Sequence, residues 1–317
     1  MRKSNVKSRG GSGGKSQGGK PATGNPSKAA HPKGQAKGKG GNGGIRGQAK
    51  ATRDSLAAQA AHAEKRGMRD PRAPRDTARW VVGIHSCLET LRIRPKKIRE
   101  VWIREDYLSS EQLREISELA IRHRIELKPK SPGQLDQVGT GNQGVALAAM
   151  ESPELKWKSL EGDGTHVVLL LDGLEDPHNL GSILRTAWLT GVTAILTPED
   201  RAVGLTPSVC KIASGGAEHV PVDTHANLPS AMQQLKDLGF WIYGLSEKGT
   251  RKPWEFELPK KTAWVVGSEG SGLRVPTERA CDELVRIPQV ATGSSYNASI
   301  AAAMALSETC RQLKQPE

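Results

Sequence analysis

The sequence has few of the residues that crosslinked, metal-binding or membrane-spanning proteins require. Cysteine occurs four times in 317 residues, at Cys87, Cys210, Cys281 and Cys310, without CxxC or Cys/His metal spacing. No segment approaches about 18 consecutive apolar residues, and the first residues contain no apolar stretch typical of a secretory signal. Because free thiols persist in reducing compartments, these absences predict a cytoplasmic protein with buried cysteines, no metal and no membrane span.

Aromatic and acidic residues are almost missing from the first quarter of the chain. Residues 1–75 contain no Phe, Tyr or Trp and hold 18 Lys/Arg against 3 Asp/Glu, a net charge of +15. Residues 76–317 hold 28 Lys/Arg and 31 Asp/Glu, a net charge of −3. A segment of this composition cannot bury a core, so we expect 1–75 to be a disordered tail. Its clustered cations favour binding to RNA or DNA phosphates, with a merely solubilising tail as the alternative.

The remaining chain is centred on the stretch from Ala263 to Met304. The apolar run Ala263–Val266 predicts a buried strand that ends at Gly267, followed by a turn rich in glycine. Gly267, Gly270 and Gly272 allow positive φ and let the backbone approach a ligand closely. The alternative is that these glycines only form a tight connection between elements.

A second predicted junction follows within about thirty residues. Residues 284–287 predict a strand, 289–297 form a polar loop, and an alanine-rich helix begins at Ala298. Loops at the strand ends of α/β sheets are where such sheets bind ligands, which favours a functional interpretation of both junctions. The glycine spacing is not GxGxxG, and this weighs against a nicotinamide-dependent oxidoreductase.

Three segments together resemble a known family. VVGSEGSGL at 265–273, with IP at 287–288 and SSYNASIA at 294–301, is similar to the second and third signature motifs of the SpoU/TrmH family of RNA 2′-O-ribose methyltransferases. LDGLEDPHNLGSILRTA at 171–187, about ninety residues upstream, resembles the first motif. The resemblance implies S-adenosylmethionine as methyl donor, an RNA substrate and a homodimer. It is nearest to the enzymes that methylate a guanosine of 23S ribosomal RNA.

The resemblance also implies a fold and a division into domains. We expect an α/β protein whose trefoil-knotted SPOUT methyltransferase domain, 166–317, follows a linker at 151–165 and a small α/β RNA substrate-binding domain at 79–150. The segments WVVGIHSCLETL and TGNQGVALAAM carry the weaker match to that smaller domain. Periodicity predicts helices at 85–91, 110–123 with a cap at Ser109, 181–190 and 228–238, and strands at 100–103, 125–128, 167–171, 194–197 and 241–245.

Methyl transfer to a ribose needs a bound donor, an oriented 2′-oxygen and help in removing its proton. Asn179 is expected to end a loop, and Arg185 lies six positions later in the following helix. A planar guanidinium can hold an RNA phosphate or stabilise a developing alkoxide. A role as general base would require a neutral guanidinium, which arginine does not adopt in proteins. The resemblance implies a catalytic Arg185, with its mechanism left open.

The other two motifs supply the remaining candidates. Glu269 could accept hydrogen bonds from the ribose or orient Arg185, while Ser295 and Asn297 could bind substrate and, with Ser299, cap the last helix. By position, the resemblance implies that the donor contacts Gly267, Leu273, Ile287 and Tyr296. Tyr296 stands where the family usually has Leu, Ala298 where it has Val, and Ala291 where it has a glycine that Gly293 here supplies two residues later.

Two other functions remain open at this point. A transfer-RNA 2′-O-methyltransferase of the same family would carry the same three motifs. A non-catalytic RNA-binding protein or ribosome assembly factor is the alternative from a different class, and the departures at Tyr296 and Ala298 are its only support. Binding of S-adenosylmethionine would distinguish the last alternative from the first two.

Overall fold

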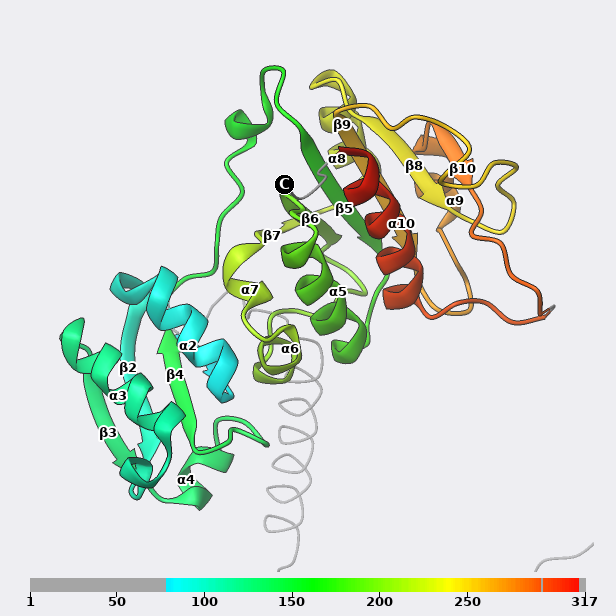
Figure 1. The fold of residues 1–317 in the computed structure, drawn as a ribbon. Coiled ribbons are helices and arrows are strands. Elements are labelled where there is room, and N and C mark those ends of the chain that lie inside the picture. The colour runs from blue at the N-terminus through cyan, green and yellow to red at the C-terminus, as the bar shows by residue number, and fades with distance from the viewer. Residues whose placement is uncertain (1–77, 292, 314–317) are drawn as a thin grey trace, which may run out of the picture. The chain divides into compact units, whose positions relative to one another are not determined.

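The computed structural model describes residues 78–291 and 293–313, so the predicted tail at 1–75 lies outside the described residues. Figure 1 shows two groups of elements, each built around its own β-sheet. Helices and strands are interspersed along the chain in both groups, as the α/β prediction requires. Among the described residues no helix has the length and apolar character needed to cross a membrane.

The first group holds a four-stranded sheet in the order β1-β4-β2-β3. Strands β2 and β3 are parallel, whereas β4 is antiparallel to both β1 and β2. The helix predicted at 110–123 begins one residue later, and Ser110 rather than Ser109 is its N-cap because Ser109 belongs to a preceding short 3-10 turn. The elements are β1 (Arg79–Val82), α2 (Ile84–Ile93), η1 (Pro95–Lys97), β2 (Ile98–Arg104), η2 (Tyr107–Ser109), α3 (Glu111–Arg122), β3 (Glu126–Lys130), α4 (Pro132–Asp136) and β4 (Val145–Ala149).

The segment 151–165 connects the two groups and is not entirely irregular. It contains the short helix η3 (Trp157–Leu160), in which Leu160 is fully buried. Leu155 and Leu160 pack in a cluster with residues of the second sheet. The segment expected to be a linker therefore covers part of the larger domain's core.

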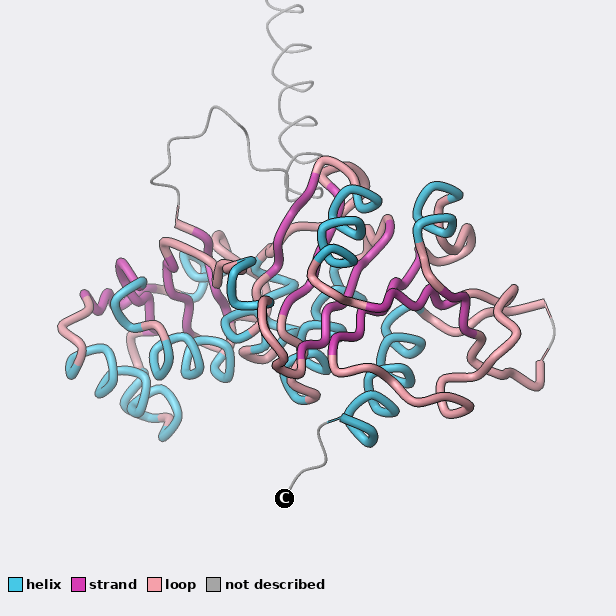
Figure 2. The backbone as a smooth tube through the Cα atoms, turned by 90° about the horizontal axis from the view of Figure 1, so that it is seen from above, coloured by secondary structure: helices cyan, strands magenta, loops and turns pink. Residues whose placement is uncertain are grey.

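The second group holds a six-stranded sheet in the order β10-β8-β9-β5-β6-β7, and every neighbouring pair is parallel. Alternate residues of a strand point to opposite faces. Val167, Leu169 and Leu171 of β5 accordingly pack with helices α5 and α10, while Val168 and Leu170 pack with α8. Both faces of the sheet are thus covered, which explains why its strands are almost continuously apolar. Figure 2 shows the strands lying between helices.

Three elements of this domain have no counterpart in the prediction from sequence, namely α6, α7 and β7. They are short and are bounded by proline and glycine, so they show little periodicity. The complete order is β5 (His166–Asp172), α5 (Pro177–Leu189), β6 (Ala194–Pro198), α6 (Pro207–Ala213), α7 (Gly216–His219), β7 (Val222–His225), α8 (Leu228–Asp237), β8 (Trp241–Leu245), β9 (Lys261–Gly267), α9 (Val275–Ala280), β10 (Glu283–Val285) and α10 (Ala298–Leu313).

One boundary matters for the site. The sequence predicts that helix α5 begins at Gly181, with Asn179 at the end of a loop, but the helix begins at Pro177. Asp176 is its N-cap and accepts a hydrogen bond from the backbone N–H of His178. Proline suits the first position of a helix because its missing N–H has no partner there. Asn179 therefore lies in the first helical turn, where the helix fixes its direction.

Candidate active site

Strands β5 and β9 are adjacent and parallel, and they end at the same edge of the sheet. Asp172, the last residue of β5, is in register with Gly267, the last residue of β9. The carboxylate of Asp172 is buried and accepts a hydrogen bond from the backbone N–H of Arg274 at 2.8 Å, and it also pairs with the guanidinium of Arg274. The glycine-rich turn after β9 is thereby tied at both of its ends to the neighbouring strand.

Within this turn the three glycines do different work. Gly270 and Gly272 have positive φ values of 88° and 66°, as expected, whereas Gly267 does not have positive φ. A Cβ atom on Gly267 would lie 2.2 Å from the carbonyl carbon of Gly272, because Ser268 and Gly272 form reciprocal backbone hydrogen bonds of 3.1 and 3.0 Å. Gly267 is thus required for close approach of the chain to itself and not for a positive φ as predicted, while a donor contact at this position stays a prediction.

A cavity of about 340 Å³ opens beside this turn. All four residues predicted to contact the donor line it, namely Gly267, Leu273, Ile287 and Tyr296. Its lining combines apolar residues with glycines, serines and charged side chains, a mixture that suits a ligand with both apolar and polar parts. The walls also include Ser295, Glu269 and the segment after β8 at 245–248, which the prediction from sequence omitted. The signal for that segment was available, because the strand predicted at 241–245 ends directly before it.

A second cavity of about 370 Å³ lies on the other side of the turn. The two cavities share Ser268, Glu269 and Ser271, so the turn forms a wall between them. Asn179 and Arg201 line only the second cavity. Arg201 adopts a left-handed backbone conformation with φ of 57°, which is uncommon outside glycine. Neither the cavity nor Arg201 was predicted.

Asn179, Glu269 and Asn297, one from each motif, form a hydrogen-bonded cluster. The side-chain amide of Asn179 donates to Oε1 of Glu269 at 2.7 Å. The side-chain amide of Asn297 donates to the same oxygen at 2.5 Å and to Oδ1 of Asn179 at 2.8 Å. Residues that are 90 and 118 positions apart in the sequence are therefore joined around Glu269, which lines both cavities.

The other end of the Asn297 side chain caps the last helix, as predicted. Its Oδ1 accepts hydrogen bonds from the backbone N–H of Ser299 at 2.9 Å and from the Ser299 hydroxyl at 2.6 Å. One side chain thus fixes the start of α10 and orients Glu269. The direction of Oδ1 and Nδ2 is set by these partners, since an amide flipped the other way would face donors with a donor.

Tyr296 uses its phenol to brace the loop. The hydroxyl donates to the carbonyl oxygen of Pro288 at 3.2 Å, across the loop that runs from the end of β10 to α10. A leucine at this position would have no such bond. The departure from the family pattern therefore adds a contact rather than removing one.

Arg185 lies outside this network. Its side chain is exposed on α5, and within residues 78–291 and 293–313 no hydrogen bond or ion pair joins it to another residue. It lines neither of the two cavities. The carboxylate of Glu269 contacts Asn179 and Asn297 instead of orienting Arg185, so that part of the expectation is not seen in this structure.

Cys281 is the nearest cysteine to the turn and is partly buried after α9. Burial raises its pKa to about 12, so the thiol is neutral at physiological pH. A neutral thiol is a poor nucleophile. In the part of the chain that the structure describes, no group of three or more His, Cys, Asp or Glu side chains is arranged to hold a metal ion.

Comparison with known proteins agrees with this geometry. Residues 166–307 match the SpoU rRNA methylase family, and residues 80–155 match the substrate-binding domain of RNA 2′-O ribose methyltransferases. The chain is 38% identical over 239 residues to the 23S rRNA (guanosine-2′-O-)-methyltransferase RlmB of Neisseria meningitidis, covering 74% of this chain and 95% of that protein. The chain belongs to the SpoU family of RNA methyltransferases.

Another curated relative and a solved structure extend this result. The RlmB protein of Pseudomonas aeruginosa is 35% identical over 240 residues, covering 73% of this chain and 96% of that protein. The structure of the SpoU methyltransferase AviRb from Streptomyces viridochromogenes in complex with AdoMet superposes with a TM-score of 0.66 at 22% identity, covering 79% of this chain and 96% of that chain. The structural likeness confirms the α/β fold.

Proposed function

We propose that this protein methylates the ribose 2′-oxygen of a guanosine in 23S ribosomal RNA, with S-adenosylmethionine as donor, in the cytoplasm. The observation that carries the proposal is the cavity beside the Asn179–Glu269–Asn297 cluster, because one site brings together residues from all three motifs. The guanosine and the ribosomal RNA come from the names of the relatives, which the chain covers over nearly their whole lengths. A transfer-RNA substrate is the alternative that the test below separates.

The cavity fits the donor on chemical grounds. An adenosine group has a flat, largely apolar ring and several polar atoms, and the lining offers Leu273, Ile287 and Tyr296 for the ring and serine and charged side chains for the polar atoms. Gly267, Gly270 and Gly272 line the cavity without side chains, which leaves room for a ligand. When bound, S-adenosylmethionine supplies an activated methyl group on a sulfonium.

The cluster is suited to orient the ribose. Both amide donors reach the same oxygen of Glu269, Oε1, which leaves Oε2 to accept a hydrogen bond from a ribose hydroxyl. The carboxylate is held by side chains that are themselves fixed by a helix turn and a helix cap. Such fixed orientation alone can lower a barrier by about 7 to 11 kcal/mol. Ser295 lies on the cavity wall and adds a hydroxyl to the same surface.

Unlike the side chains of the cluster, Arg185 has no partner among the described residues, and this supports a role in binding RNA. An exposed guanidinium without a partner in the described chain is free to bind a phosphate of the incoming RNA bidentately. We propose that it does so, which would hold the RNA on α5, the helix that also carries Asn179 of the cluster.

A homodimer and a trefoil knot complete the proposal. Helices α5 and α10 pack together, and they expose Leu189, Ile300 and Met304 to 70%, 48% and 39%. Ile300 and Met304 are four residues apart, so they share one face of α10. This apolar face supports a dimer contact close to Arg185. The return of the chain from β10, at the sheet edge, to α10 beside α5 supports a knotted C-terminal segment.

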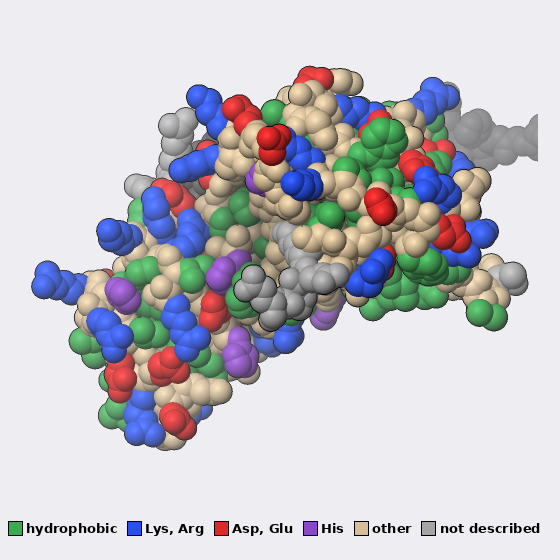
Figure 3. All heavy atoms as spheres, turned by 45° about the horizontal axis from the view of Figure 1, so that its top comes forward, with side chains coloured by type: hydrophobic (Ala, Val, Ile, Leu, Met, Phe, Trp, Pro, Cys, Tyr) green, Lys and Arg blue, Asp and Glu red, His purple; other side chains and the backbone are tan. Residues whose placement is uncertain are grey.

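We propose a separate role for each segment of the chain: residues 79–150 bind RNA, 151–165 connect the two domains, 166–317 transfer the methyl group, and 1–75 attract RNA non-specifically. On the face in Figure 3, Lys and Arg side chains are interspersed with Asp and Glu side chains. A local basic patch formed by Arg92, Arg94, Lys96 and Lys97 is the alternative source of this attraction. Three of its four cations are paired with carboxylates, namely Arg92, Arg94 and Lys97. This pairing favours the tail as the source of attraction.

The test is methylation of defined RNA. Purified protein is incubated with labelled S-adenosylmethionine and either unmodified 23S ribosomal RNA or unmodified transfer RNA, and ribose methylation is mapped by resistance to alkaline cleavage. We expect one methylated guanosine in ribosomal RNA and none in transfer RNA. Methylation of transfer RNA alone would support the alternative substrate, and failure to bind the donor at millimolar concentration would support the non-catalytic alternative.

A further inference from the structure

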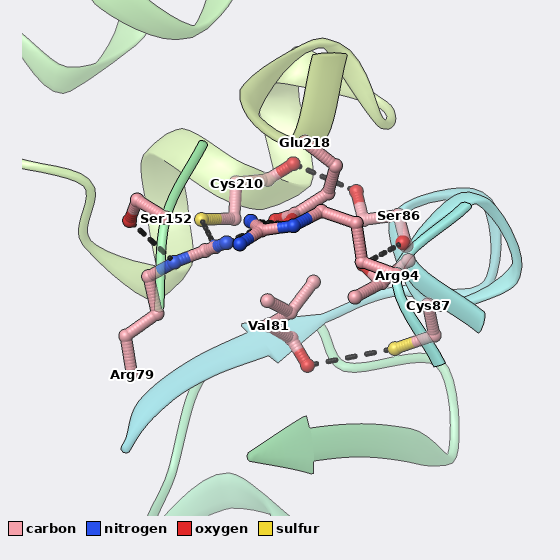
Figure 4. Close-up of polar contacts among 9 residues, drawn as sticks. Arg79, Val81, Ser86, Cys87, Arg94, Ser152, Cys210 and Glu218 are labelled. Carbon is pink, nitrogen blue, oxygen red and sulfur yellow. Dashed lines mark hydrogen bonds and ion pairs between the residues drawn. The ribbon is translucent and has the colours of Figure 1, made fainter. Parts of the chain in front are cut away.

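Helix α7 contacts both domains at once, and its Glu218 is the most buried charged group at their junction. The Glu218 side chain is 1% exposed. Its carboxylate accepts hydrogen bonds from Arg79 of β1 and, at 3.3 Å, from Arg94, which follows α2. Figure 4 shows both guanidinium groups directed from the smaller domain toward this carboxylate. Two cations of the substrate-binding domain are thus held by one anion of the methyltransferase domain.

The Arg79 guanidinium is fixed on all sides. Besides Glu218, it donates to the sulfur of Cys210 in α6 and to the hydroxyl of Ser152, both at 3.1 Å. Burial raises the pKa of Cys210, so this thiol is a neutral acceptor and adds no charge. Side chains with this many partners have little freedom to move, and the contact therefore sets a defined geometry.

The opposite side of α7 lies directly on the helix that carries Arg185. A Cβ atom on Gly216 would be 2.5 Å from the carbonyl oxygen of Leu184 and 3.0 Å from the backbone nitrogen of Arg185. Only glycine permits this approach. A shift of α7 toward α5 would therefore press on the peptide group between Leu184 and Arg185.

His219 makes a second connection of the same kind. Its ring stacks on Trp188 of α5, with centroids 4.2 Å apart and an interplanar angle of 9°. Its Nε2 atom lies 3.1 Å from Oε2 of Glu89 in α2 of the substrate-binding domain. Trp188 is three residues after Arg185, on the next turn of α5. Both ends of this short helix thus join the substrate-binding domain to α5.

We infer that α7 couples the substrate-binding domain to Arg185, with Glu218 as the positioning residue. RNA held on the smaller domain is thereby presented to α5 in a fixed register. The inference rests on the proposed function, since it assumes that Arg185 acts on the RNA. Buried ion pairs contribute little net stability compared with apolar residues of similar volume, so fixed geometry accounts better for this arrangement than stability does.

The decisive variant is Glu218→Gln in the full chain, which keeps the size of the side chain and removes its charge. We expect the single-turnover rate at saturating ribosomal RNA and donor to fall by roughly tenfold to a hundredfold, because small misplacements of reacting groups have effects of this size. The dissociation constant for S-adenosylmethionine should change by less than about twofold, because the donor cavity does not include α7. A residue that only stabilises the fold would not separate these two quantities.

Glu308→Gln is the matched control. Glu308 is also mostly buried, at 12% side-chain exposure, and pairs with Arg311, but both residues belong to α10 and neither contacts the smaller domain. We expect its rate to stay within about twofold of the wild type. A thermal melt of each variant establishes that the protein compared is folded.

Two further variants keep the test decisive if Gln at position 218 unfolds the protein. Glu89→Gln weakens the contact with His219 at a more exposed position, and a smaller loss of about threefold to tenfold is expected. Arg94→Gln should also slow methylation. Combined with Glu218→Gln, it should be no slower than the slower single variant, because both remove the same contact.

The outcomes separate this inference from the proposed function. A wild-type protein that leaves ribosomal RNA unmethylated would overturn both. An active wild type together with folded Glu218→Gln and Glu89→Gln proteins of unchanged rate would overturn the coupling alone. A parallel loss of donor affinity and rate would also overturn it, because α7 would then serve general stability.

Discussion

The loops after β9 and β10 are held by many hydrogen bonds within the chain, whereas the exposed face of α5 around Arg185 has none for its guanidinium among the described residues. The three motifs thus divide into two kinds of residue. Asn179, Glu269 and Asn297 are organised before any ligand binds. Arg185 is presented on a rigid helix but not engaged. We interpret the cluster of Asn179, Glu269 and Asn297 as the part that binds the donor and the ribose, and Arg185 as a residue that binds the RNA.

The largest effect is expected when Gly267, in the glycine-rich turn beside the hydrogen-bonded cluster, is replaced by valine. A Cβ atom at this position would lie 2.2 Å from the backbone of Gly272, so the turn cannot keep its shape. We expect donor binding to become undetectable by calorimetry and donor-induced thermal stabilisation to disappear. Gly133→Ala is the control, because a Cβ atom there meets nothing within 4 Å. Normal donor affinity in the Gly267→Val protein would show that the turn does not form the donor site.

Removing the unengaged residue should have a smaller and more selective effect. Arg185→Ala should lower the methylation rate by at least about a hundredfold while leaving donor affinity within about twofold. Arg185→Lys should recover little, because an ammonium group cannot replace the planar fork. Arg279, another exposed arginine of the same domain, provides the control variant Arg279→Ala. A near-normal rate for Arg185→Ala would contradict its assigned role.

A more selective test of the hydrogen-bonded cluster is a substitution at Asn297 that replaces one atom and keeps the helix cap. In Asn297→Asp, one oxygen can still accept the hydrogen bonds at the start of α10, but the other faces Oε1 of Glu269 in place of an amide donor. Two carboxylates in contact cannot both ionise freely, so the pKa of the pair should rise.

We therefore expect Asn297→Asp to be about tenfold slower than the wild type at neutral pH. The ratio of variant to wild-type rate should increase as the pH falls, because protonation of one carboxyl group restores a donor. A pH–rate profile of both proteins measures this ratio. A ratio that does not depend on pH would show that Glu269 and residue 297 do not interact during the reaction.

A milder substitution tests the hydrogen bond between the Tyr296 hydroxyl and the loop that precedes α10. Tyr296→Phe removes the hydrogen bond to Pro288 while keeping the ring. A neutral hydrogen bond contributes about 0.5 to 1.5 kcal/mol, so donor affinity should fall by roughly twofold to tenfold with little change in rate at saturating donor. Tyr107→Phe, in the smaller domain, serves as the control. Unchanged affinity would mean that the phenol does not contribute to donor binding.

The smallest effect on turnover is expected from deletion of residues 1–75. Because these residues carry a net charge of +15, their removal should raise the KM for RNA and flatten its salt dependence. The slope in question is that of the logarithm of the RNA-binding constant against the logarithm of the salt concentration. Its magnitude should decrease by roughly 0.7 to 0.9 for every phosphate that the protein no longer neutralises. Turnover at saturating RNA should be unchanged within about twofold. A truncated protein with the full salt slope would place the attraction on the folded domains.

The sequence predicted the larger architecture because strand ends and motifs are local signals. The strands β5, β8 and β9 and the helix α10 were found within a few residues of their true bounds. The four residues predicted from motif positions to contact the donor all line one cavity. What sequence reasoning missed depends on contacts across the fold. Nothing local in Gly216 or Glu218 shows that α7 will lie between two domains.

The contact between Gly267 and Gly272 was missed for the same reason. A glycine in a turn is usually explained by positive φ or by a bound ligand, and the sequence cannot show that its neighbour is residue 272 of the same turn. The start of α5 was misplaced for a different reason. Asp176 and Pro177 form a good helix start, but the motif was interpreted as a loop because it follows a strand directly.

The most direct test of this account is a structure of the protein with S-adenosylmethionine bound. We predict donor density in the cavity between the turn at 267–273, Ile287 and Tyr296, with the methyl group facing Glu269 and with Asn179 and Asn297 in their present positions. Arg185 should remain without a partner until RNA is added. Donor density in the second cavity would contradict this account. A rearranged cluster with Arg185 bound to the donor would also contradict it, because we assign the donor to the first cavity and Arg185 to the RNA.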